Sequence, residues 1–325
     1  MHILGIETSC DETACAVVSD GKLIRSSVVS SSVAFHRKYG GIVPEIAFRK
    51  QLETISEVAE CAFHEAGVRR GDIAAIAFTE KPGLLGSLLV GISFARALGL
   101  ALGIPVVPVD HLYSHIYACF LGKKNTVRFP CVGLIVSGGH TSLYYLKDYL
   151  DLKLLGSTQD DACGEAFDKV AKILQLGYPG GPVIEKRARA GDPRAIRFSC
   201  SNTKAPLDFS FSGIKTAVLY YTQKHPAERR RIADICASFQ DAALNTLVDK
   251  SLLACTIKKT DTLAVGGGVA ANTVLREKFE EQARRRGIRV LFPDKPLCMD
   301  NAAMVAGLGY HLYKLARKRG HDHAH

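Results

Sequence analysis

The sequence predicts an α/β protein with two similar lobes, and two observations support this fold class. Short apolar runs that fit buried strands alternate with longer segments of helical periodicity, which is typical of mostly parallel or mixed sheets. A β-turn-β-turn-β arrangement at the N-terminus also recurs about 130 residues further along the chain. This repeat indicates an internal duplication.

The repeated arrangement supplies the first strands of each lobe. In the first copy, apolar strands are expected at 3–7, 14–18 and 23–29, with a polar turn at 8–13. In the second copy, strands are expected at 131–136, 142–146 and 152–155, around the glycine-rich turn 137–141.

The remaining segments complete the two lobes. Helices are expected at 43–67, 87–102, 111–120, 161–176, 232–253, 272–285 and 301–316, and strands at 73–78, 105–109, 262–265 and 288–292. Residues 177–182 fit a turn and residues 191–212 an irregular segment. We predict lobe I at 1–130 with helix 300–318 packing back on it, lobe II at 131–299, and a flexible tail at 319–325.

The composition is that of a globular protein with a basic surface. No apolar run reaches the ~18 residues of a membrane span, and the N-terminus lacks signal-peptide features. We therefore expect a cytoplasmic protein with no membrane partner, whose ten cysteines are reduced. The formal net charge is +10, with basic clusters at 69–70, 229–231, 284–286 and 314–319. These clusters fit either a polyanion-binding surface or solvated helix faces.

His111 and His115 are the first candidate functional residues. They lie four residues apart on a predicted helix that directly follows strand 105–109, so both imidazoles can reach one divalent metal. Two partly buried histidines without a metal would give the same spacing. A zinc peptidase is excluded, because the metalloprotease motif needs Glu directly after the first His, and this position is Leu112.

Glycine-rich turns recur at 137–139, 180–181 and 266–268, where each follows a strand or a helix. Glycine lets backbone N–H groups approach a phosphate or ribose closely. Three such turns in a duplicated fold indicate a nucleotide held in a central cleft between the lobes. The chain contains neither GxxxxGK[ST] nor a GxGxxG after a strand, which excludes a P-loop enzyme and disfavours dinucleotide binding.

Three aspartates lie in polar breaks beside predicted helices or hairpins. Asp11 is in the first hairpin turn, Asp168 is within helix 161–176, and Asp300 opens the last helix. Asp300 could complete a site of two histidines and one carboxylate, or it could serve only as a helix N-cap.

These motifs resemble those of the bacterial tRNA N6-adenosine threonylcarbamoyltransferases, a family once described as glycoprotein endopeptidases. The resemblance runs from residue 3 to about residue 310. It rests on GIETSCDETACAVV (5–18), YGGIVPE (39–45), PGLLGSLLVG (82–91), DHLYSH (110–115), VSGGHTSL (136–143), DDACGEAFDKVAK (160–172), GYPGGP (177–182), DFSFSGIKTA (208–217), VGGGVAAN (265–272) and CMDNAAMVA (298–306).

The resemblance implies an actin-like fold of the sugar kinase and heat-shock chaperone type, with two duplicated lobes. It implies transfer of a threonylcarbamoyl group from threonylcarbamoyl-adenylate to N6 of the adenosine just 3′ of the anticodon. The substrates would be tRNAs that read codons beginning with adenine. It also implies two protein partners, a smaller inactive paralogue of the same fold and a small P-loop ATPase.

The resemblance also implies roles for individual residues. His111, His115 and Asp300 would bind one divalent metal, with Fe²⁺ favoured over Zn²⁺. Threonylcarbamoyl-adenylate would be bound by Ile135, Val136, Ser137, Gly138, Gly139, Asp168, Gly181, Glu185 and Asn272. Asp11 is the best candidate for a general base.

The chain departs from the usual family pattern at several positions, including Lys81, Asp110, Met299 and the segment 48–51, which commonly ends in His and here ends in Gln51. None of these departures removes a predicted metal ligand. Two other classes remain as alternatives: an ATP-dependent kinase or ATPase of the same fold, and a non-catalytic nucleotide-binding subunit. Neither explains the histidine pair.

Overall fold

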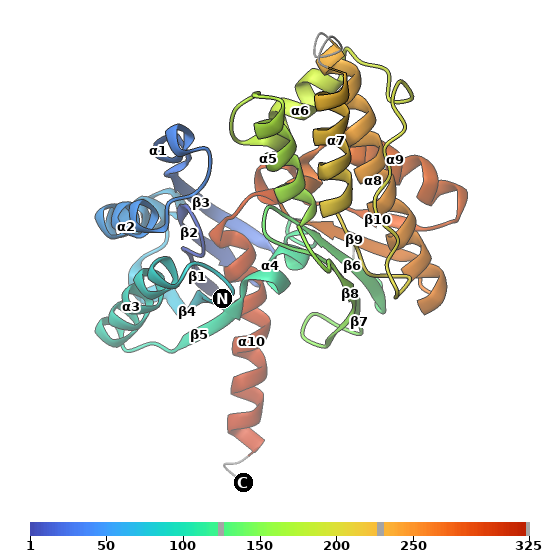
Figure 1. Ribbon diagram of the computed structural model, residues 1–325. Helices are drawn as coiled ribbons and strands as arrows, with labels where there is room; N and C mark the ends of the chain where they lie inside the picture. The colour runs from blue at the N-terminus through green and yellow to red at the C-terminus, as the bar shows by residue number, and fades with distance from the viewer. Residues whose placement is uncertain (123–126, 226–230, 323–325) are drawn as a thin grey trace. The chain divides into compact units, whose positions relative to one another are not determined.

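The structure is a computed structural model that describes residues 1–122, 127–225 and 231–322 (Figure 1). The chain forms two compact units. Unit 1 comprises Met1–Val127 and Met299–His325, and unit 2 comprises Arg128–Cys298.

Unit 1 is built on a mixed five-stranded sheet. Its strands are β1 (His2–Glu7), β2 (Glu12–Ser19), β3 (Leu23–Ser31), β4 (Ile73–Lys81) and β5 (Val106–Asp110), in the order β3-β2-β1-β4-β5. The hairpin strands pair antiparallel, while β4 and β5 join β1 in parallel. The carboxyl ends of β1, β4 and β5 therefore lie at the same edge of the sheet.

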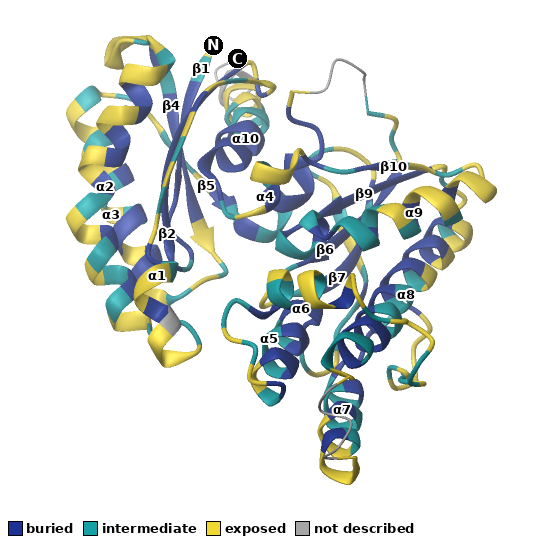
Figure 2. Cartoon of the chain, turned by 90° about the horizontal axis from the view of Figure 1, so that it is seen from above, coloured by how far each residue is buried: buried dark blue, intermediate teal, exposed yellow. Residues whose placement is uncertain are grey.

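Helices cover both faces of this sheet. Helices α2 (Pro44–Ala66) and α3 (Leu85–Leu102) pack on one face, and α10 (Ala302–Asp322) packs on the other (Figure 2). The short helices α1 (Val33–His36) and α4 (His111–Ala118) follow β3 and β5. Because helices cover both faces, β1 and β2 are buried at nearly every position, and the polar residues of β2 lie at its two ends.

Close packing of β1 against α10 depends on Gly5. A Cβ at Gly5 would lie 2.1 Å from the carbonyl oxygen of Ala302, which no side chain can occupy. This contact joins the first strand of the chain to the start of its last helix. It therefore fixes where the segment before α10 lies.

Unit 2 has a second mixed sheet of five strands. They are β6 (Cys131–Val136), β7 (Thr141–Leu146), β8 (Leu152–Ser157), β9 (Thr262–Gly266) and β10 (Arg289–Leu291), in the order β10-β9-β6-β7-β8. Strands β6, β7 and β8 pair antiparallel, and β9 and β10 join β6 in parallel. The two sheets have the same topology, which confirms the duplicated architecture predicted from the sequence.

The core of unit 2 surrounds the long helix α8 (Ile232–Lys258), which is buried along most of its length. The other helices are α5 (Cys163–Ile173), α6 (Gly180–Ala188), α7 (Ser212–Lys224) and α9 (Thr273–Arg285). Short 3₁₀ segments include η4 (Gly268–Ala271) and η5 (Lys295–Cys298).

Three expectations from the sequence need correction. The segment 177–182 is a turn only to Pro179, because α6 begins at Gly180. Helix α7 was not predicted at all. Residues 319–322, expected in a flexible tail, continue α10. Residues 323–325 of the expected tail and the arginines at 229 and 230 of the cluster 229–231 lie outside the described residues.

Among the described residues, one helix is long and apolar enough to cross a membrane by length and composition. This helix is α3, and it packs on β4 and α2. Helices in the layers of globular proteins meet the same criterion. Two thirds of the residues of α3 are nevertheless not buried. Leu85, Leu89 and Leu100 are exposed. Unit 1 therefore presents an unusually apolar helical surface.

Candidate metal centre and nucleotide-binding region

The histidine pair lies where β5 gives way to α4. The Asp110 side chain caps this helix by accepting hydrogen bonds from the backbone N–H groups of Leu112 and Tyr113, at 2.9 and 3.2 Å. Aspartate and asparagine are equivalent N-caps, so Asp110 gives the helix the same start that an asparagine would give. His111 occupies the first turn and His115 the second, with ring centroids 4.6 Å apart.

Asp300 joins the two histidines from the start of α10. The Asn301 side chain is the one that caps this helix, because its Oδ1 accepts a hydrogen bond from Met304 N–H at 3.0 Å. The alternative role of Asp300 as an N-cap is therefore not the one found. Its Oδ1 lies 3.1 Å from His115 Nε2 and 3.6 Å from His111 Nε2.

These three residues have the geometry of a metal-binding site. One ligand atom from each lies within 4.8 Å of the others, and both histidines are buried. Ligands about 2.0–2.2 Å from a metal ion are separated from one another by about 3.0–3.5 Å. The 3.1 Å separation from His115 lies within this range and the 3.6 Å separation from His111 lies just above it, so the donor set fits a divalent metal after small side-chain shifts.

Glu7 supports the site from the end of β1. Its buried carboxylate accepts hydrogen bonds from Ser9 N–H at 2.5 Å, Thr79 Oγ1 at 2.5 Å and His111 Nδ1 at 2.9 Å. A carboxylate can only accept, so Nδ1 of His111 carries the proton and Nε2 is left to face Asp300. Sequence reasoning missed Glu7, although a carboxylate closing an apolar strand was a visible signal.

The charges of this cluster shift the pKa of His111. Burial lowers this pKa, but the negative charges of Glu7 and Asp300 outweigh burial and raise it to about 9. Burial raises the pKa of Glu7, but the neighbouring His111 outweighs burial and lowers it overall. Without a metal, the cluster is therefore stabilised by an imidazolium between carboxylates.

The predicted base, Asp11, lies in the turn after β1 and is buried. Within the described part of the chain, its Oδ2 is buried and has no hydrogen-bond partner. Burial, followed by the charges of Asp300 and Asp11, raises the pKa of the adjacent Glu12 to about 10. A protonated Glu12 can donate a hydrogen bond to the Asp11 carboxylate, and this side-chain hydrogen bond also raises the pKa of Glu12.

Gln51 on α2 holds this turn in place. It is fully buried, and its Nε2 donates to the carbonyl oxygens of Glu12 at 2.9 Å, Cys10 at 3.1 Å and Thr8 at 3.4 Å. Gln51 therefore orients the segment that carries Asp11, a role that its sequence context did not reveal.

The residues predicted to bind the adenylate all belong to unit 2 and form one connected region. Ile135 and Val136 end β6, and the turn of Ser137, Gly138 and Gly139 follows. Gly164 at the start of α5 donates its N–H to the Ser137 carbonyl oxygen at 3.1 Å. The glycine turn therefore packs against the N-terminus of α5.

The chain of contacts continues through three helix N-termini. The Asp168 carboxylate on α5 accepts a hydrogen bond from Gly180 N–H at 2.7 Å. This bond caps the start of α6, where Gly181 follows. Glu185 on α6 accepts from Thr273 N–H at 3.1 Å, at the start of α9. Helix N-termini favour anions, and here a carboxylate already takes one N–H group at the start of α6 and one at the start of α9.

Several predicted ligand-binding side chains are already engaged by the fold. Asn272 is the N-cap of α9: its Oδ1 accepts from Leu275 N–H at 3.0 Å, and its Nδ2 donates to Gln240 at 3.0 Å. Burial raises the pKa of Asp168 despite the hydrogen bond from Gly180. Gly138, Gly139 and Gly181 differ, because no atom lies within 4 Å of a Cβ placed on any of them.

Solved structures share this fold at low sequence identity. Full-length HypF in its phosphate- and nucleotide-bound form has a TM-score of 0.64 at 14% identity, over 97% of this chain and 46% of that chain. The (R)-2-hydroxyglutaryl-CoA dehydratase component A of Acidaminococcus fermentans has a TM-score of 0.57 at 14% identity, over 96% and 98% of the two chains. The fold is thus the actin-like ATPase fold predicted from the sequence.

Sequence relatives narrow this class to one family. The family model of the tRNA N6-adenosine threonylcarbamoyltransferases, TsaD, matches residues 23–307. Relatives of that name are 51% identical in Symbiobacterium thermophilum over 313 residues, with 96% of this chain and 92% of the relative covered. In Clostridium kluyveri the identity is 49% over 317 residues, covering 96% and 93%. The chain belongs to the tRNA N6-adenosine threonylcarbamoyltransferase family.

Proposed function

We propose that this protein transfers the threonylcarbamoyl group of threonylcarbamoyl-adenylate to N6 of the adenosine 3′ of the anticodon, in tRNAs that read codons beginning with adenine. AMP is the second product. The observation that carries this proposal is the cluster of His111, His115 and Asp300, whose ligand atoms lie within 4.8 Å of one another in a chain of this family. A kinase of the same fold has no use for this donor set.

We assign one divalent metal to this cluster. Two imidazoles and one carboxylate suit Fe²⁺, our first choice, and also Zn²⁺. When bound, the metal would act as a Lewis acid toward the phosphate or the carbonyl of the donor. The hydrogen bond from His111 Nδ1 to Glu7 keeps the imidazole oriented with Nε2 toward Asp300.

Unit 2 would bind the adenylate. The proposed contacts are the β6 end and its glycine turn (Ile135, Val136, Ser137, Gly138, Gly139), the helix N-termini at Asp168 and Gly181, and Glu185 and Asn272. Backbone N–H groups of the open glycine turn can donate to oxygens that gain charge as AMP leaves. The helix N-termini favour the phosphate.

The transfer forms one bond and breaks another. The N6 lone pair of the adenosine forms the new C–N bond to the carbamoyl carbon, and the bond from that carbon to the phosphate oxygen breaks, so AMP leaves with the electron pair. The amine must also lose a proton. We assign its acceptance to Asp11, whose buried Oδ2 has no partner among the described residues. Because an exocyclic amine is a weak nucleophile, positioning would contribute most of the rate.

The partners follow the same reasoning. A smaller paralogue of this fold would cover the exposed apolar part of α3, where Leu85, Leu89 and Leu100 are 75%, 52% and 86% exposed. A small P-loop ATPase would act on the assembled complex. With tRNA as a substrate, we place the protein in the cytoplasm.

The direct test is reconstitution. Purified protein, its partner proteins, tRNA and synthetic threonylcarbamoyl-adenylate are incubated, and the digested nucleosides are measured by mass spectrometry. We expect threonylcarbamoyladenosine with the unaltered chain and none with Asp300→Asn. Glu53→Gln, which changes an exposed carboxylate of α2, is the matched control. Modified adenosine at an unchanged rate in Asp300→Asn would refute the assigned centre, and its absence from all samples would refute the function.

A further inference from the structure

We propose that a pocket in unit 2, between the irregular segment 193–200 and helix α8, binds a phosphate-bearing nucleotide of the tRNA away from the adenosine that reacts. None of the residues assigned above to the adenylate or the metal lines this pocket. The proposal rests on the proposed function, because that function supplies tRNA as the occupant.

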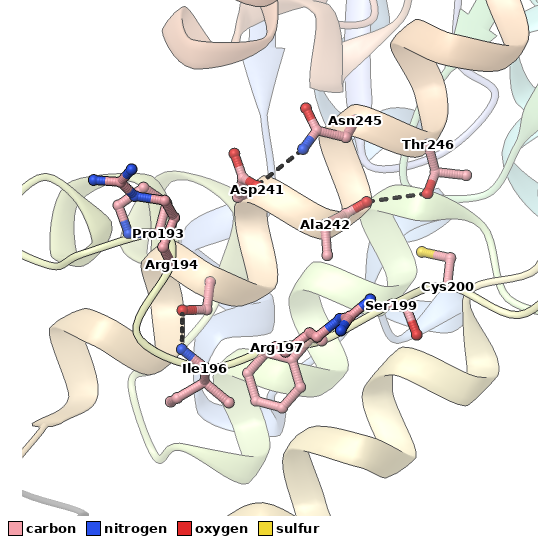
Figure 3. A pocket seen from close by; sticks show the side chains of 12 residues that line it. Pro193, Arg194, Ile196, Arg197, Ser199, Cys200, Asp241, Ala242, Asn245 and Thr246 are labelled. Carbon is pink, nitrogen blue, oxygen red and sulfur yellow. Dashed lines mark hydrogen bonds between the residues drawn. The ribbon is translucent and has the colours of Figure 1, made fainter.

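The pocket has the size of a ligand site and lies open to solvent. Its volume is about 480 Å³, within the range of about 300–1,000 Å³ that is typical of small-ligand sites. Figure 3 shows Arg194 and Arg197 on the irregular segment and Asp241, Asn245 and Thr246 on the facing surface of α8.

The wall formed by the irregular segment is anchored to α8. Ile196 N–H donates to Ser238 Oγ at 3.1 Å (Figure 3), and Ser238 in turn donates to the Asp192 carbonyl oxygen at 3.3 Å. Asp192 N–H donates to the Asp234 carboxylate at 2.8 Å. These bonds give an irregular segment a defined shape, so the pocket exists before any ligand arrives.

The charges of the pocket favour a polyanion. Arg194 is 93% exposed, and its ion pair with Asp192 spans 4.0 Å. Arg197 is exposed and has no ion pair or hydrogen bond within the described part of the chain. Asp241 is the one carboxylate in the lining, and Lys278 at 2.6 Å and Asn245 at 2.9 Å engage it. Two guanidinium groups are therefore left for phosphate, which they bind in bidentate geometry.

The rest of the lining suits a base. The ring of Phe198 is partly buried against Tyr221, with centroids 5.8 Å apart, and Ile196 and Ala242 add apolar surface. An aromatic ring beside arginines is the pattern that binds an unstacked nucleotide. Because both guanidinium groups lie exposed at the rim, they suit a phosphate backbone that crosses the pocket better than an enclosed free nucleotide.

The test is the salt dependence of tRNA binding, measured by fluorescence anisotropy with labelled tRNA and the full chain. Each lost phosphate contact lowers the slope of log K against log salt by about 0.7–0.9, so we expect a decrease of about 1.4–1.8 for Arg194→Ala with Arg197→Ala. Affinity at physiological salt should fall roughly tenfold. The control is Arg49→Ala on α2, an exposed arginine outside the basic clusters, for which we expect a much smaller change.

Cys200 provides a second measurement, because it lines the same pocket. tRNA should slow its alkylation, as measured by peptide mass spectrometry, while AMP at the same concentration should not. Protection by AMP alone would identify a free-nucleotide site and overturn the proposal. An equal loss of tRNA affinity in Arg49→Ala, or none in the double variant, would also overturn it. Binding is measured without product, so failure of the transferase reaction stays a separate result.

Discussion

Replacing Glu7 with glutamine tests how the metal centre is organised. The change preserves size, yet the new amide cannot accept hydrogen bonds at both of its terminal atoms. At present one oxygen of Glu7 accepts from Ser9 N–H, and the other accepts from Thr79 Oγ1 and from Nδ1 of His111. At least one donor therefore loses its partner in the variant, and the remaining pairs lose a charge.

The expected magnitude follows from the role of outer carboxylates. Removing such a partner of a metal-ligating histidine lowers metal affinity by about 10–100-fold, which corresponds to about 1.4–2.7 kcal/mol of binding free energy. The metal-free variant should also show a lower His111 pKa, because burial, which lowers it, would be opposed mainly by Asp300.

Two measurements check this expectation. Zn²⁺ or Co²⁺ affinity is determined by competition with a chelator, and the His111 pKa is followed by NMR in the metal-free protein. Glu53→Gln, an exposed change in the same unit, should leave both values unchanged. Unaltered metal affinity in a folded Glu7→Gln variant would show that Glu7 does not orient His111.

Four further predictions concern unit 1. Metal affinity should rise about tenfold per pH unit until about pH 9 and then level off, because a metal must displace the proton of His111, whose pKa is about 9. A metal affinity that does not change with pH, measured by isothermal titration calorimetry, would contradict this. The same raised pKa stabilises the metal-free fold fully below about pH 6.5, and this contribution is lost as the pH rises through 9. Gln51→Leu removes the donor to three carbonyl oxygens and should destabilise the fold by about 1–3 kcal/mol in urea titrations, whereas Gln51→His should restore part of the loss. Leu89→Lys should abolish binding of the paralogue in size-exclusion chromatography without lowering the melting temperature, and an intact complex would refute the assigned surface.

Much of the fold was predictable because local patterns are strong where both faces of an element are buried. The hairpin strands of both sheets were found within a few residues, and Gly67 was correctly expected to end α2, where its φ is 61°. Helix α6 was missed because its first residues look like a turn. Its N-terminal cap is Asp168, from another helix, and a cap of that kind leaves no local signal.

The cluster of His111, His115 and Asp300 was only partly predictable, because contacts between residues far apart in the chain leave no local signal. His111 and His115 share a helix, so spacing revealed them. Asp300 is 185 residues from His115 in the chain, and Glu7 is 104 residues from His111. Only the pairing of β1 with β4 and of β4 with β5 brings Glu7 to the start of α4. The position of Asp300 left its role as a ligand or a helix N-cap open until the family resemblance favoured the ligand, while Glu7 required the structure.

The glycines of the predicted adenylate region fall into two groups: some are needed for close packing of the fold, and others have open space where a side chain would lie. A Cβ on Gly164 would lie 2.6 Å from the Ser137 carbonyl oxygen, and one on Gly180 would lie 2.6 Å from the Phe167 carbonyl oxygen. These glycines are needed for packing. Gly138 and Gly139 have neither a positive φ nor a neighbour within 4 Å of a Cβ, so nothing within the described structure requires glycine there.

A ligand that approaches the backbone would require it. Gly139→Ala should therefore keep or slightly raise the melting temperature, since alanine restricts the unfolded chain. Binding of a non-hydrolysable adenylate analogue, measured by calorimetry, should fall at least tenfold because the methyl group occupies the approach to the turn. Gly164→Ala, one contact away, should instead lower the melting temperature. Unchanged affinity in Gly139→Ala would place the adenylate elsewhere in unit 2.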